Sequence, residues 1–497
     1  FNRVNSVQTF VGFANGRWIF DSTDGFLEDL KNHTNKHVLL FLQQAGVGGR
    51  SVEDAGTQSI PQTEPALFIQ DSWQVTPRLN VQYGLRWEAE IEPDPLTPPD
   101  QVFFSKFIGQ TRLGQEFPSN GKIPSDYGMW QPRLGLAWDP QGNGKSVFRA
   151  NAGIFYGRVP GLTLASTRST NGSIGQSIFR SSAFNPDGCL PIYPNPLAAS
   201  CIGAPFDPDI FVFDKNFKNP RTKSASVSWE KEAIPNYSFL AKANYAKGEH
   251  ITRFVNRNDP LLGSPWSTGL GSDGSNGVGQ LTTVESSARS LYQGVTIGVT
   301  RRPTNNIAWE VNYTYSKDKS DDDNERDPFT LRYAKVTDLA AEYGYSDRDQ
   351  RHRINSWLLW NAPYGTNVNF RYSYRSAQPK SLACVVSAAF CGVDAFGNSR
   401  FMADANTPQD RINPDGSVTQ RNLGRKDNQY SSLDLRVARP FQYAGVTIEP
   451  AIDAFNLFNS KNLHRPEVTN LIFNFDGTVQ SGTGDPRQFQ LGLRVIW

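Results

Sequence analysis

Long apolar runs are absent from this chain of 497 residues. A membrane-spanning helix needs about 18 consecutive apolar residues, whereas the best candidate, residues 38–42 (VLLFL), is far shorter. The mean hydropathy of −0.49 and the hydrophobic content of 38% are also low for a helical membrane protein. The net charge is only +2, so the chain has no overall electrostatic attraction for nucleic acid or another anionic partner.

Cysteine and histidine are scarce. The four cysteines form two close pairs, Cys189 with Cys201 and Cys384 with Cys391. They include no Cys-x-x-Cys motif and no neighbouring histidine, which disfavours a zinc site. An even number at short spacing predicts two disulfides in an oxidising compartment, and four unpaired thiols are the alternative.

A secretory leader is not visible, and the first residue is Phe1 rather than methionine. Proteins exported from the bacterial cytoplasm are made with such a leader. We therefore expect the chain to be a piece of a longer protein that lacks its natural N-terminus.

The last nine residues alternate strictly between apolar and polar side chains. One face carries Phe489, Leu491, Leu493, Val495 and Trp497, and the other carries Gln490, Gly492 and Arg494. This pattern predicts a strand with one face for lipid and one for a wet lumen. It also resembles the C-terminal signal by which bacterial outer-membrane proteins are recognised by the barrel-assembly machinery.

Similar alternation recurs along the chain, and aromatic residues reach 12%. Segments such as 79–88, 307–316 and 368–375 put apolar side chains at every second position and mostly polar or charged ones between them. About fourteen strands are predicted, at residues 3–14, 64–76, 78–91, 127–139, 145–157, 220–232, 237–249, 289–301, 307–319, 351–361, 367–378, 429–439, 446–458 and 487–497.

The predicted connections alternate between short and long. The short ones are rich in Pro, Gly, Asn and Asp, as turns are. The long ones lie near 17–63, 93–126, 158–218, 251–288, 320–350, 379–428 and 459–486. Short turns at one rim and long loops at the other are typical of outer-membrane barrels. The predicted fold is an all-β antiparallel transmembrane barrel with long extracellular loops and short periplasmic turns, in one domain over residues 1–497.

Several segments resemble the Oar-like group of TonB-dependent outer-membrane receptors. In the order of that family they are residues 64–79 (EPALFIQDSWQVTPRL), 83–88 (YGLRWE), 131–140 (QPRLGLAWDP), 151–157 (NAGIFYG), 347–353 (DRDQRHR), 454–459 (AFNLFN) and 484–488 (GDPRQ). The resemblance implies a barrel of about 22 strands around an N-terminal plug, driven by TonB. This chain has room for about fourteen strands and shows no plug or TonB-contacting segment, so we expect the missing strands upstream of Phe1.

An acidic cluster is the one candidate for a metal site. It comprises Asp321, Asp322, Asp323, Glu325 and Asp327, in a predicted extracellular loop. Calcium prefers several carboxylate oxygens, but the cluster lacks the spacing of an EF-hand, and the interpretation as a solvated acidic loop is favoured. No other cofactor and no catalytic residue set is predicted.

The sequence therefore predicts the barrel part of a TonB-dependent receptor or transporter in the bacterial outer membrane. Its expected partners are membrane lipid, the barrel-assembly machinery, TonB through the absent N-terminal region, and an extracellular ligand. An adhesin or export-associated Oar-like protein is the main alternative. An outer-membrane hydrolase is disfavoured because the five histidines are scattered. A soluble propeller or sandwich is disfavoured by the alternating connection lengths.

Overall fold

A computed structural model of the chain describes residues 2–9, 13–183, 185, 188–202, 207–267, 277–323, 333–395, 397–405, 407–462 and 486–497. One 16-stranded sheet dominates these residues. Thirteen long strands form its wall: β5 (Ala66–Thr76), β6 (Leu79–Glu90), β9 (Asp126–Trp138), β10 (Ser146–Tyr156), β13 (Arg221–Ile234), β14 (Tyr237–Asn256), β15 (Leu281–Thr304), β16 (Ile307–Ser320), β18 (His352–Ala362), β19 (Thr366–Arg375), β22 (Tyr430–Ala438), β24 (Val446–Phe455) and β25 (Gln488–Ile496).

Shorter strands and helices complete the fold. Three further strands of the same sheet are β12 (Ile210–Phe213), β17 (Gly344–Tyr345) and β23 (Phe441–Tyr443). Smaller sheets contain β1 (Asn2–Thr9), β2 (Arg17–Phe20), β3 (Val38–Gly46), β4 (Thr57–Glu64), β7 (Thr111–Arg112), β8 (Gln115–Glu116), β11 (Gly175–Arg180), β20 (Pro379–Lys380) and β21 (Gly424–Arg425). The α-helices are α1 (Thr23–Asn32), α2 (Val52–Gly56), α3 (Gly161–Ser169) and α4 (Ala388–Cys391). None of the helices in the described ranges is long and apolar enough to cross a membrane.

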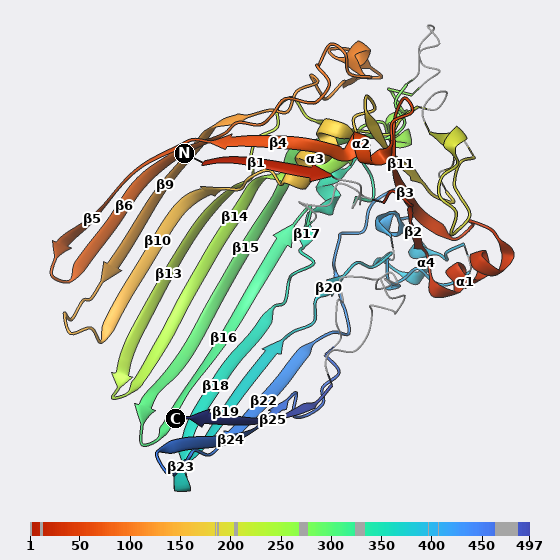
Figure 1. Ribbon diagram of the computed structural model, residues 1–497. Helices are drawn as coiled ribbons and strands as arrows, with labels where there is room; N and C mark the ends of the chain where they lie inside the picture. Colours follow the sequence, from red (N-terminus) through yellow and green to blue (C-terminus); the bar gives the residue numbers. More distant parts are fainter. Residues whose placement is uncertain are drawn as a thin grey trace.

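The wall is an antiparallel meander, in which each long strand pairs with its neighbours in the chain. Short connections such as 77–78, 235–236 and 305–306 lie at one rim, which we call the turn rim. The long connections gather at the opposite rim, the loop rim, with the helices and small sheets (Figure 1). This confirms the predicted alternation of short and long connections, because a meander places successive connections at opposite ends of the sheet.

The strand register places the predicted apolar side chains on one continuous face. Across neighbouring strands, Leu358 lies opposite Phe370, Phe370 opposite Leu435, and Leu435 opposite Ala454. The same face continues to the chain end, where Ile452 lies opposite Leu491. Ile452 and Leu491 are exposed, and Leu358, Phe370 and Leu435 are partly exposed, as side chains on a surface that contacts lipid must be.

The opposite face of the wall is polar. Asn355 of β18 lies opposite Ser373 of β19, and Arg371 of β19 lies opposite Asp434 of β22. Because side chains alternate along a strand, consecutive residues lie on opposite faces. This face is mainly polar, although Trp357 also lies on it, opposite Arg371. This polar face is the surface that a closed barrel turns toward its water-filled lumen.

β14 and β15 extend far beyond the length that a membrane requires. They contain 20 and 24 residues, whereas about 9–11 residues span a bilayer. Residues 251–255 and 281–285 are buried on both faces under the long connections. The predicted loop over 251–288 was therefore wrong at both ends, where the chain continues as strand. Strands that are buried on both faces need no alternation of apolar and polar residues, so the sequence pattern did not reveal them.

The first predicted barrel strand, residues 3–14, is not part of the wall. Instead, β1 pairs with β4 in a separate two-stranded sheet. Its apolar residues Val4 and Val7 are three positions apart, so β1 offers no continuous apolar face to lipid. We call β1 and β4 together the strap, because they cross the loop rim of the wall (Figure 1).

The wall is open along its two edge strands, β5 and β25, which lie at opposite ends of the sheet (Figure 1). Among the described residues, β5 pairs only with β6, and β25 pairs only with β24. The prediction that the strand ending near Trp497 has an open edge is confirmed for this part of the chain.

Candidate functional site

The long connections pack into one layer over the loop rim. Ile60 of the strap inserts into a buried apolar cluster with Leu164 of α3, Phe213 of β12, Phe254 of β14 and Val284 of β15. Polar contacts fix the same strand: the Gln58 amide donates to the Ala165 carbonyl at 3.0 Å, and Arg168 donates to the Ser59 carbonyl at 2.7 Å. The strap is therefore a fixed part of this layer.

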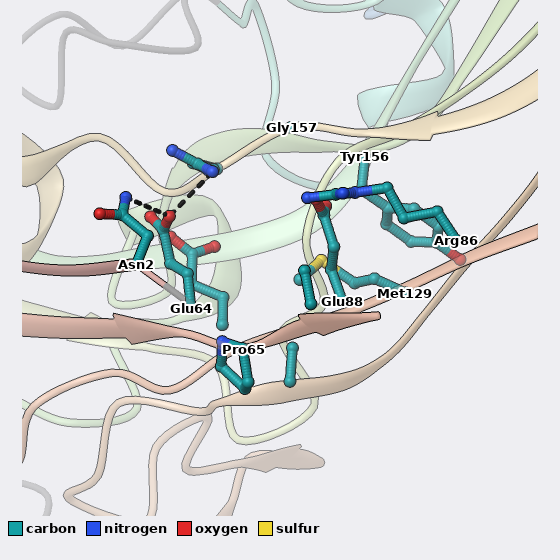
Figure 2. Close-up of a pocket in the computed structure, with 12 residues that line it drawn as sticks. Asn2, Glu64, Pro65, Arg86, Glu88, Met129, Tyr156 and Gly157 are labelled. Atoms are coloured by element: carbon teal, nitrogen blue, oxygen red, sulfur yellow. Dashed lines mark hydrogen bonds and ion pairs between the residues drawn. The ribbon is translucent and has the colours of Figure 1, made fainter. Parts of the chain in front are cut away.

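A pocket of about 120 Å³ lies where the strap meets the ends of β6, β9 and β10. Figure 2 shows Asn2 and Glu64 on one side, and Arg86, Glu88 and Tyr156 on the other. Glu64 accepts a hydrogen bond from Asn2 at 3.0 Å and pairs with Arg158 at 2.8 Å. Glu88 pairs with Arg86. The carboxylates at this pocket thus have partners from several strands.

Two more carboxyl groups, Glu90 and Glu92, lie buried beside the pocket. The Gln62 amide from the strap donates to both of them at 3.2 Å. Glu90 also accepts hydrogen bonds from Asn219 and from the backbone N–H of Val159. Burial raises the pKa of Glu92 to about 9, and the Glu90 carboxylate adds to this rise. Glu92 is therefore protonated at neutral pH, and the cluster ties the strap to the wall.

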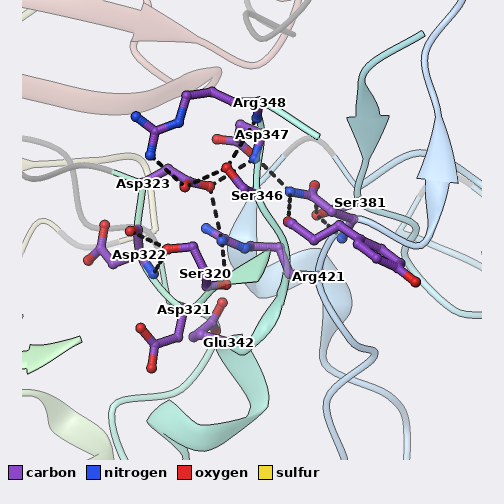
Figure 3. Close-up of polar contacts among 12 residues, drawn as sticks. Ser320, Asp321, Asp322, Asp323, Glu342, Ser346, Asp347, Arg348, Ser381 and Arg421 are labelled. Atoms are coloured by element: carbon purple, nitrogen blue, oxygen red, sulfur yellow. Dashed lines mark hydrogen bonds and ion pairs between the residues drawn. The ribbon is translucent and has the colours of Figure 1, made fainter. Parts of the chain in front are cut away.

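The predicted acidic cluster lies in a network of arginines (Figure 3). Asp321 pairs with Arg253 at 3.1 Å and accepts the backbone N–H of Arg289 at 2.6 Å. Asp323 pairs with Arg421 at 3.0 Å and accepts the Ser346 hydroxyl at 2.9 Å. These contacts join the connections after β16 and β19.

The described members of this cluster are not arranged around a cation. Arginine guanidinium groups occupy the positions next to Asp321 and Asp323, and within the described ranges no group of His, Cys, Asp and Glu side chains could hold a metal ion. Glu325 and Asp327 lie outside the described residues.

A fully buried ion pair reinforces the same layer. Arg411 donates to both carboxylate oxygens of Glu342, at 2.5 and 2.6 Å, and both side chains are 2% exposed or less. Glu342 also accepts the backbone N–H of Ala334 at 2.7 Å. The two long connections that follow β16 and β19 are locked together by these bonds.

The four cysteines are joined as the sequence predicts. The Sγ atoms of Cys189 and Cys201 lie 1.99 Å apart, and those of Cys384 and Cys391 lie 2.05 Å apart. Each disulfide closes a short loop within one long connection at the loop rim, and no described cysteine is free.

The C-terminal residues lie as the alternation requires. Phe489, Leu491, Leu493 and Val495 pair with Ala454, Ile452, Pro450 and Ile448 on the apolar face. Trp497 is 93% exposed. The strand that carries the predicted assembly signal therefore presents its whole apolar face to the surroundings of the wall.

Sequence reasoning missed the buried carboxyl groups of the strap pocket. Glu88, Glu90 and Glu92 occupy every second position at and just after the end of β6. This spacing could have indicated a buried polar cluster, because charged side chains on a strand that enters a buried layer need partners. Gln62 and Asn219 supply those partners from distant segments, and nothing in the sequence connects them to β6.

An antiparallel wall with an apolar outer face, a polar inner face and one loop-bearing rim defines a membrane β-barrel. The chain belongs to the outer membrane beta barrel domain family, whose model matches residues 1–383. The protein is therefore located in the bacterial outer membrane, and the loop rim is its extracellular side.

Solved structures resemble this chain. The outer membrane transporter YddB from Escherichia coli shares its fold, with a TM-score of 0.52 and 9% identity, over 92% of this chain and 50% of that one. A ferric enterobactin receptor mutant from Pseudomonas aeruginosa, PfeA, gives a TM-score of 0.48 and 11% identity, over 92% and 51%. The chain thus spans about half the length of these proteins. No curated protein sequence matches it.

Proposed function

We propose that this chain is the barrel portion of a TonB-dependent outer-membrane receptor or transporter, in a single barrel domain. It has no enzymatic role. The ligand binds from outside through the long connections, and a plug, together with contact to TonB, controls its passage. The barrel-assembly machinery recognises Phe489, Leu491, Leu493, Val495 and Trp497.

The observation that carries this proposal is the packing of the long connections into one layer. The strap, the connection between β10 and β13, and the extended ends of β14 and β15 share one apolar core. Arg253, in the extended end of β14, and Arg421 both pair with the acidic residues at the end of β16. These contacts hold the layer in a fixed arrangement over the polar lumen. Binding sites need side chains in fixed positions, so this arrangement supports a role in ligand recognition.

The proposal is tested by cross-linking in native membranes. The full-length gene product, with a photoreactive group in its most N-terminal segment, should cross-link to TonB when an extracellular ligand mixture is present. Deletion of that segment should abolish the cross-link and leave the barrel assembled in the outer membrane. A full-length protein that never contacts TonB would contradict a TonB-dependent function and favour the adhesin or export role.

A further inference from the structure

Two arginines face each other on the polar face of the wall without a counter-ion. Arg353 of β18 lies directly opposite Arg375 of β19. Both side chains are exposed, and neither makes an ion pair or hydrogen bond in the described part of the chain. Like charges at directly opposed positions of an antiparallel pair destabilise it. Within the described residues, no ion pair compensates this unfavourable arrangement.

The lateral neighbours on this face and the next row toward the turn rim are neutral. Thr314 of β16 lies beside Arg353, and Tyr430 of β22 lies beside Arg375. The next row toward the turn rim contains Asn355 opposite Ser373. The first carboxylates in that direction, Glu310 and Asp434, lie two rows away, or roughly 13 Å along the strands.

Toward the loop rim, the buried carboxylate of Asp349 is already engaged. Asp349 pairs with Arg425 at 2.6 Å and with Arg351 at 3.3 Å, and its side chain is fully buried. It therefore does not neutralise Arg353 or Arg375. The two guanidinium groups form a local cationic site, although the net charge of the whole chain is only +2.

The site is also held in place and open to the lumen. The Arg375 guanidinium carbon lies 4.9 Å from the centre of the Tyr430 ring, a cation–π contact that orients the side chain. Arg353 is the second residue of β18 and Arg375 is the last of β19, so both lie at the extracellular mouth. A solute that passes the long connections reaches them at the top of the lumen.

We propose that Arg353 and Arg375 bind an oxyanion, a carboxylate or phosphate group, of a small solute at the extracellular mouth of the barrel. The planar guanidinium donates two parallel hydrogen bonds to such groups. This inference deepens the proposed function, on which it rests, by naming the chemistry of the ligand. The mouth position favours a free solute over the carboxylate of a protein segment inside the lumen.

The test uses the full-length protein in detergent micelles, with inorganic phosphate as the probe and chloride at equal ionic strength as the reference. Phenylglyoxal modifies accessible arginines, and mass spectrometry then reports the rate at each position. Phosphate should protect Arg353 and Arg375 from modification, and chloride should not. Calorimetric titration should give phosphate binding that each of Arg353→Gln and Arg375→Gln weakens by about 10- to 100-fold.

The matched control is Arg436→Gln. Arg436 is also on the polar face, but it pairs with Asp453 at 3.1 Å, so this substitution should leave phosphate binding unchanged. The proposal is overturned if phosphate does not bind, if chloride protects equally, or if Arg436→Gln weakens binding as much. It is also overturned if both arginines of the full-length protein are protected without phosphate, which would identify a protein carboxylate as the occupant. None of these outcomes depends on TonB, so a failure here is distinct from a failure of the proposed function.

Discussion

At the scale of single residues, the loop rim contains several buried ionisable groups. Glu92 is 8% exposed, and its raised pKa reflects the loss of water around the carboxyl group. Glu342 and Arg411 are buried as a bidentate pair. Such groups respond to pH and to substitution far more strongly than surface charges do, because water cannot replace a lost partner.

The strap should loosen as the pH rises. The pKa of Glu92 increases from 4.5 to about 9 when the carboxyl is buried, so the closed strap keeps a proton that an open strap releases. Between about pH 5 and about pH 9, closure should weaken by up to about 1.4 kcal/mol per pH unit. Hydrogen exchange of β4, corrected for intrinsic rates, measures this. Glu92→Gln should weaken the dependence, although the neighbouring Glu90 carboxyl stays buried. Glu53→Gln should retain it in full, and equal pH dependence in both variants would contradict the assignment.

Breaking the buried ion pair should destabilise the loop layer. Arg411→Leu leaves the Glu342 carboxylate buried without its cation, at a cost of roughly 3–5 kcal/mol. Hydrogen exchange of residues 333–345 measures the loss. Arg302→Gln removes a pair between an exposed arginine and the partly buried Glu232, and should cost less than about 1 kcal/mol. Replacing both partners, as in Arg411→Leu with Glu342→Leu, should recover part of the stability; no recovery would contradict an electrostatic cause.

At the scale of the strand, the two faces of the wall should tolerate charge very differently. Val311 and Leu435 lie on the apolar face, so Val311→Arg or Leu435→Arg should cost roughly 2–4 kcal/mol near the middle of the membrane. Arg371→Gln on the polar face should cost much less. Denaturant unfolding of the barrel in lipid vesicles measures all three. Similar costs on both faces would refute the assignment of lipid and lumen sides.

Strands that face lipid on one side were predictable, because their alternation is a local property of the sequence. The segments around Leu435, Val311 and Leu491 show this, and the structure places them as expected. Residues 251–255 were not predictable as strand, because burial on both faces removes the alternation. The contacts of Gln62 with Glu90 and Glu92 could not be predicted from the sequence either, because the fold brings together segments about 30 residues apart.

At the scale of the whole molecule, the wall contains an odd number of long strands because β1 is not one of them. β5 and β25 therefore both run from the loop rim to the turn rim. Bacterial single-chain barrels have even numbers of antiparallel strands, so these two edges cannot pair with each other in that pattern. Closure in lipid needs an odd number of further strands between them.

This arrangement predicts the outcome of disulfide trapping in the chain alone. Ile452→Cys with Leu491→Cys joins two registered neighbours on β24 and β25 and should cross-link efficiently. Leu67→Cys with Leu491→Cys places one thiol on each edge strand and should not cross-link. The four native cysteines are already paired and do not interfere. An efficient bridge between the two edge strands in that second variant, seen by electrophoresis without reductant, would show a wall that closes on itself.

The apolar cluster at the loop rim has a consequence for how such proteins diversify. Ile60, Leu164, Phe213 and Val284 come from separate segments and share one core. A mutation that enlarges one side chain must be accommodated by the others, because packed cores leave no spare volume. New specificities should therefore arise when related genes exchange the strap and these connections together, as one block. Exchange of a single connection should disrupt the packing of the others.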